Sequence, residues 1–189
     1  MVLRFLGDRM RKVPVISQAV ADCVRDEVTI DEAVIADIAH RMRQTNPVLA
    51  REIGLMMDGK NNGIIVFTAS VVYRLIERQS EIDNERGFVI SQEVADYVKQ
   101  EITEGRMSID DIAIRARQTN PALIREIGLM MDGKNKAIVV NVAFIVYRLI
   151  ERQCEVENER GSLTNLPGRI LMLKDVIVGR WKEGSLLCF

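Results

Sequence analysis

Few residues of this sequence are of types that commonly do chemistry. Most of these lie in one of two similar halves and have no counterpart in the other half. Residues 16–87 and 90–161 are similar halves, so a residue needed for chemistry in both halves should occur in both. The thiols and the single histidine, which can act as nucleophiles, bases or metal ligands, do not. Cys23 aligns with Tyr97, Cys154 with Ser80 and His40 with Ile114. We therefore expect no catalytic residue, no metal site and no cofactor, and we interpret His40 as a surface residue.

A second candidate is a run of carboxylates, which could bind a divalent cation. The run contains Glu77, Glu81, Asp83 and Glu85, and it is interleaved with Arg74, Arg78 and Arg86. Opposite charges three or four residues apart are typical of an ion-paired helix surface. The spacing predicts ion pairs at this position rather than a metal site, and the sequence has no Gly-rich phosphate loop or Cys/His metal motif.

The duplication itself is the strongest signal in the sequence. At a constant offset of 74 residues, 47 of 72 aligned positions are identical, including the runs RQTNP, REIGLMMDGKN and YRLIERQ. Only Phe88 and Val89 separate the two units, so the linker is too short to let them move independently. Residues 1–15, an N-terminal arm, and residues 162–189, a C-terminal appendage, have no counterpart.

Apolar residues recur at helical spacing, and the punctuation consists of helix caps. We expect four helices in each unit. The first follows Ser17 or Ser91 as N-cap. The second begins at Thr29, with Glu32 completing a capping box, in unit one. In unit two it begins at Ser108 with Asp111, after Gly105 ends a longer first helix.

The third helix is expected to begin at Asn46-Pro47 and Asn120-Pro121, with Asn as N-cap and Pro at the first helical position. It should end at Gly59 and Gly133 in the left-handed conformation. The fourth, at about 62–83 and 136–157, is apolar on all sides in its first half, which predicts a central position. The predicted fold class is all-α: two four-helix units of about 72 residues form an intramolecular pseudo-dimer, with an approximate twofold axis through contacts between their fourth helices.

Charge and hydropathy limit the functional classes. The 26 basic and 27 acidic residues nearly balance, and the units are mildly acidic while both ends of the chain are basic. Such a body provides no general electrostatic attraction to nucleic acid. The longest apolar stretches are about half of the ~20 residues that a transmembrane helix needs. These features predict a cytoplasmic protein with no membrane contact.

The sequence favours two functions, neither of them enzymatic, over a third, an enzyme with an unrecognised carboxylate site. The first is a binding or scaffolding module that contacts a protein, another copy or a different chain, through duplicated polar residues. These are Arg51, Glu52, Asp58, Lys60 and Asn61, with Arg125, Glu126, Asp132, Lys134 and Asn135. The alternative is a DNA-binding regulator, because the short helix, turn and second helix at 108–131 resemble a helix-turn-helix in layout. Its DNA-facing residues would be Gln44, Asn46, Arg51 and Lys60, with Gln118, Asn120, Arg125 and Lys134.

The appendage contains an apolar segment at residues 168–181, with eight large apolar side chains in fourteen positions. This is more apolar surface than a small soluble chain leaves exposed to water. We predict that the segment packs against the divergent face of the fourth helices, at Phe67 and Val71 or at Phe144 and Ile145, or joins a second chain.

Overall fold

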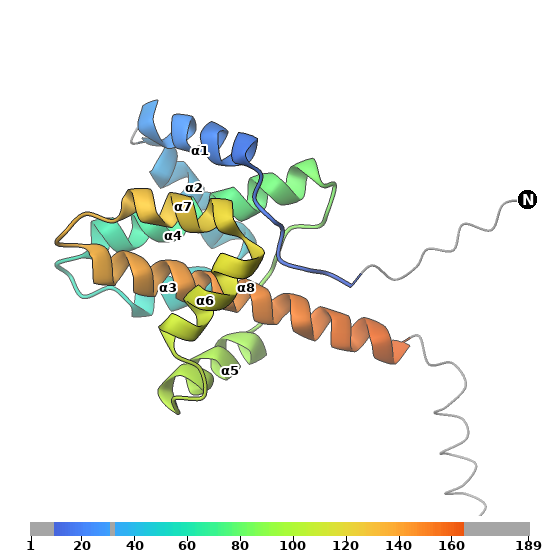
Figure 1. Cartoon of the computed structure of the whole chain (residues 1–189). Coiled ribbons are helices and arrows are strands. Elements are labelled where there is room, and N and C mark those ends of the chain that lie inside the picture. The colour runs from blue at the N-terminus through green and yellow to red at the C-terminus, as the bar shows by residue number, and fades with distance from the viewer. Residues whose placement is uncertain (1–9, 31–32, 165–189) are drawn as a thin grey trace, which may run out of the picture. The chain divides into compact units, whose positions relative to one another are not determined.

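The computed structural model describes residues 10–30 and 33–164, and within that range the regular secondary structure consists of helices without strands (Figure 1). The prediction of an all-α chain is therefore confirmed. The helices are α1 (Gln18–Ile30), α2 (Ala33–Thr45), α3 (Pro47–Leu55), α4 (Asn62–Ile82), α5 (Gln92–Thr103), α6 (Ile109–Thr119), α7 (Pro121–Met130) and α8 (Lys136–Thr164). None of them is long and apolar enough to cross a membrane.

The chain divides into two compact parts. Residues 12–154 form one part, and the described residues of the other are 10–11 and 155–164. In the second part, the side chain of Asn158 accepts a hydrogen bond from the backbone of Arg11 and donates one to its carbonyl, and Glu157 pairs with the Arg11 guanidinium. The apolar segment at 168–181 lies outside the described residues.

Several predicted helix boundaries are confirmed. Ser91 accepts a hydrogen bond from the backbone of Val94 as the N-cap of α5, and Ser108 and Asp111 form a complete capping box on α6. The hydrogen bonds that Asp111 accepts from Ser108 hold the pKa of this carboxyl below its ordinary value. Gly105 follows the C-cap of α5 with a positive φ angle of 69°, as predicted for the end of the first helix of unit two. Gly59 also has a positive φ angle, of 80°, but α3 ends at Leu55, so the predicted end of the third helix at Gly59 is wrong.

Three further predictions at helix ends are wrong. Thr29 does not begin the second helix, because α1 continues through it and its hydroxyl donates to the Arg25 carbonyl one turn earlier. Gly133 does not adopt the left-handed conformation. The third helices begin at Pro47 and Pro121 as predicted, but the side chains of Asn46 and Asn120 form no cap hydrogen bond. Both asparagine side chains form hydrogen bonds with backbone groups that are distant in the sequence.

The fourth helix of unit one is central, as its apolar circumference predicts. Every residue from Thr68 to Ile76 on α4 is buried, and α4 contacts α1, α2, α3 and α7. On α8, the run from Val146 to Ile150 is buried in the same way. Because these helices have no solvent face along these stretches, the shorter helices are held in place by packing against them.

Buried arginines on these long helices are paired with carboxylates from the first helices. Arg148 on α8 binds Glu101 through two hydrogen bonds of 2.9 and 3.0 Å, and both side chains are more than nine-tenths buried. Arg74 on α4 makes the same two-pronged contact with Glu27 at 3.0 and 3.2 Å. This contact holds the pKa of Glu27 below its ordinary value. Each pair fixes its long helix against the first helix of its own unit.

Candidate functional site

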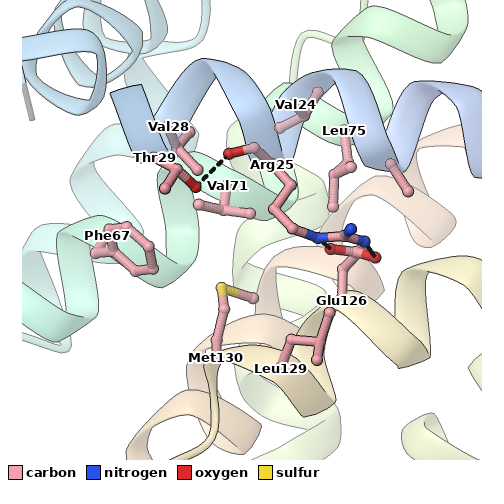
Figure 2. A pocket seen from close by; sticks show the side chains of 11 residues that line it. Val24, Arg25, Val28, Thr29, Phe67, Val71, Leu75, Glu126, Leu129 and Met130 are labelled. Carbon is pink, nitrogen blue, oxygen red and sulfur yellow. Dashed lines mark hydrogen bonds and ion pairs between the residues drawn. The ribbon is translucent and has the colours of Figure 1, made fainter. Parts of the chain in front are cut away.

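A groove opens between α1, α4 and α7, with a cavity volume of about 350 Å³ (Figure 2). Its walls are mostly apolar. Val24 and Val28 come from α1, Phe67, Val71 and Leu75 from α4, and Leu129 and Met130 from α7. Figure 2 shows Val24 and Val28 above the hollow, on α1, and Leu129 and Met130 below it, on α7. The groove therefore resembles a site for an apolar side chain more than a site for a charged ligand.

An ion pair joins α1 to α7 at the side of this groove. The Arg25 guanidinium binds both carboxylate oxygens of Glu126, one from Nε at 3.1 Å and the other from Nη2 (Figure 2). The hydrogen bond to Glu126 raises the pKa of Arg25 above its ordinary value. Since the Glu126 side chain is only 7% exposed, it is part of the structure and is not available to a partner. The prediction that Glu126 is a partner-binding surface residue is therefore wrong.

Among the described residues of the two units, the most exposed large apolar side chains lie on the third helices. Leu55 on α3 is 60% exposed and Leu129 on α7 is 61% exposed, and these two leucines occupy aligned positions. Val15 and Val89, also aligned, are exposed to a similar degree in the segments that precede α1 and α5. Sequence periodicity missed the leucines, although the identical REIGLMM run is where they occur.

Hydrogen bonds between the units come in matched pairs. Arg51 on α3 donates to Gln92 on α5 at 3.1 Å, and Arg125 on α7 donates to Gln18 on α1 at 3.2 Å. Arg51 aligns with Arg125, and Gln18 aligns with Gln92. Each glutamine in turn donates to an aspartate on its own helix at 2.8 Å, Asp22 or Asp96.

The asparagines before α3 and α7 form a second matched pair, which we call the asparagine clamps. Asn46 donates to the Phe88 carbonyl and accepts from the Ile90 amide at 2.9 Å. Asn120 donates to the Pro14 carbonyl at 2.7 Å and accepts from the Ile16 amide at 3.0 Å. Both asparagines are almost fully buried, so neither is available to contact DNA.

The helix-turn-helix layout differs from the predicted one in a further respect. A single residue, Asn120, lies between Thr119 of α6 and Pro121 of α7, whereas the DNA-binding motif has a turn of three or four residues. The other six residues that were expected to face DNA are exposed: Gln44, Arg51, Lys60, Gln118, Arg125 and Lys134. Of the eight residues expected to face DNA, two are therefore buried and six lie on the surface.

The remaining predicted surface residues form two equivalent turns. The Asp58 carboxylate accepts the backbone amides of Lys60 and Asn61, at 3.0 and 2.8 Å, and these bonds lower the pKa of Asp58. Asp132 accepts the amides of Lys134 and Asn135 in the same way, at 3.1 and 2.8 Å. These aspartates are used by the turns themselves. Glu52 is half-buried, without a hydrogen-bond or ion-pair partner among the described residues.

The residues first considered for chemistry are separate in the structure. His40 is exposed on α2, beside Gln44 at 3.0 Å, and Cys23 lies 3.8 Å from the Glu27 carboxylate. Arg74 binds Glu77 at 2.9 Å and Arg78 binds Glu81 at 2.8 Å, which confirms the ion-paired interpretation for those carboxylates. In the described ranges, no three Cys, His, Asp or Glu residues are grouped as metal ligands.

Comparison with protein-family models, with curated proteins and with solved structures gave no match. The functional interpretation therefore depends on the chain's own residues and contacts.

Proposed function

We propose that this protein is a non-enzymatic helical binding module, built as an intramolecular pseudo-dimer, that binds another protein through a surface present in both units. The matched hydrogen bonds support the pseudo-dimer. α3 of unit one contacts α5 of unit two, and α7 of unit two contacts α1 of unit one. Such reciprocity is typical of a twofold interface, in which the same two surfaces meet twice.

The observation that carries the binding function is the pair of exposed leucines. Leu55 and Leu129 stay in water at aligned positions, although apolar side chains of this size are favoured in cores. Leu129 also lines the apolar groove between α1, α4 and α7, so the exposed side chain and the cavity form one continuous surface. A single exposed leucine is common on protein surfaces, but a leucine continuous with an open apolar groove forms a larger apolar patch, and such patches mark protein-binding sites.

Site-specific photo-crosslinking tests this function. Benzoylphenylalanine at position 129, in the full chain expressed in its cell of origin, should give a discrete adduct of higher mass after irradiation. The same group at position 114 is the control. Ile114 is also an exposed apolar residue, but it is not duplicated, because the aligned residue in unit one is His40. Equal labelling at both positions, or no adduct at 129, would contradict the proposal.

The DNA-binding alternative is separated from this function by its salt dependence. A protein that neutralises phosphates loses affinity for duplex DNA steeply as salt rises. A mobility-shift titration with generic duplex DNA at 50 and 200 mM salt provides the measurement. Tight binding at low salt that is lost at high salt would favour the regulator, whereas we expect no shift at either concentration.

A further inference from the structure

Each third helix presents an arginine and a leucine one turn apart, and both side chains are exposed. Arg51 precedes Leu55 on α3, and Arg125 precedes Leu129 on α7. Residues four apart lie on the same face of a helix. We call these the Arg–Leu patches: patch one is Arg51 with Leu55, and patch two is Arg125 with Leu129.

The guanidinium of each patch has donors to spare. Among the described residues, Arg51 makes one hydrogen bond and Arg125 makes one, in each case to the neutral amide oxygen of a glutamine. Their charge therefore has no carboxylate in direct contact. By contrast, Arg25, Arg74 and Arg148 are each bound to carboxylates. Since a guanidinium has five N–H donors, most of those in the patches face solvent.

We propose that each Arg–Leu patch binds an acidic, apolar segment of a partner protein, so that one chain holds two such segments. This inference rests on the proposed binding function and gives it a partner chemistry. A carboxylate of the segment accepts two parallel hydrogen bonds from the arginine, a geometry that guanidinium groups favour. An apolar side chain one turn away on the segment covers the leucine.

The two patches differ in what lies beside them. Patch two borders the groove, whose α4 wall includes Phe67. The residue aligned with Phe67 is Asn141, which is exposed on α8. A large apolar side chain from the segment therefore has more surface to cover at patch two, and we expect patch two to bind more tightly than patch one.

A phage library of random 12-residue peptides, selected against the full chain, provides the probe. We expect enriched peptides to carry Asp or Glu three or four residues from Leu, Ile or Phe. A synthetic enriched peptide is then titrated calorimetrically into the wild-type chain and into R51E, R125E and the double variant. Two sites are expected in the wild type and one in each single variant. The double variant should bind at least about tenfold more weakly, since like charges in contact oppose binding.

The matched control is the double variant R43E/R117E, which makes the same change in net charge at two other aligned, exposed arginines. It should bind the peptide as the wild type does, because neither arginine belongs to an Arg–Leu patch. Circular dichroism and a thermal melt verify that every variant is folded. The neutral variants R51Q and R125Q separate loss of attraction from added repulsion, and they should give an intermediate affinity.

The possible results distinguish the acidic-partner inference from the binding function on which it rests. If the enriched peptides bind through Leu55 and Leu129 but lack acidic residues, or tolerate the double charge reversal, the acidic-partner inference is wrong and the binding function stands. One site per chain, unaffected by one of the two single variants, would overturn the two-site claim. If no peptide is enriched, both the inference and the binding function fail.

Discussion

The asparagine clamp at Asn120 gives the most direct test of how the two units are joined. Replacing Asn120 with Ala removes the partner of two buried backbone groups, the Pro14 carbonyl and the Ile16 amide. Leaving one buried polar group without a partner costs about 1–3 kcal/mol, so the pair should cost about 2–6 kcal/mol. A simple N-cap would cost about 1 kcal/mol.

Urea denaturation with linear extrapolation measures this loss of unfolding free energy. For a chain of this size, it corresponds to a fall in melting temperature of roughly 5–20 °C. Hydrogen exchange at the Ile16 amide is the specific assay, because the clamp predicts faster exchange there. Gln118→Ala is the control, since Gln118 is exposed two residues away and should change stability by less than about 0.5 kcal/mol. A loss of 1 kcal/mol or less, with unchanged protection at Ile16, would refute the clamp.

Three further results are expected. Replacing Arg148 with Met should lower the free energy of unfolding by about 3–5 kcal/mol in a denaturant melt, because it leaves the Glu101 carboxylate buried and unpaired. Adding Glu101→Leu removes that carboxylate and should recover much of the lost stability. A protease site inserted between Arg86 and Gly87, which are exposed at the end of unit one, should give fragments that co-elute on size exclusion after cleavage, and separate elution would contradict the pseudo-dimer. Burial raises the pKa of the Tyr147 hydroxyl, so the unfolded chain loses the phenolic proton at lower pH than the folded chain, and stability should fall as pH rises above about 10. Thermal melts from pH 9 to 11 should show a shallower fall for Tyr147→Phe.

The sequence predicted the helices because local signals define them. Ser91, and Ser108 with Asp111, cap the nearest backbone amides, and the apolar pattern of α4 requires burial on every side. Such signals depend on residues within a few positions, so no tertiary information is needed. The local rule was wrong at Thr29 because the first helix continued through it, and the hydroxyl found an acceptor within that helix.

The candidate site was less predictable because its parts are distant in sequence. The clamp at Asn120 joins residues more than 100 positions apart, and an Asn-Pro pair before a helix has the local appearance of an N-cap. The groove requires Val28, Phe67 and Met130 to lie on three helices around one space. The divergence between Phe67 and Asn141 was the available signal, since it marked a position where the units have different surroundings.

Identical residues in the two units also need not have identical environments. Glu126 and Glu52 are aligned, yet Glu126 is buried against Arg25, whereas Glu52 is half-buried and makes no ion pair with Lys99, the residue aligned with Arg25. A guanidinium can bind both oxygens of a carboxylate while an ammonium is a point charge, so the exchange of Arg for Lys removes the two-pronged contact. The α1–α7 side of the interface is therefore joined by an ion pair that the α3–α5 side lacks. Although the same arginine and leucine recur on both third helices, each preceded by an asparagine, the two sides of this interface are not equivalent, and the groove lies on the side that the ion pair joins.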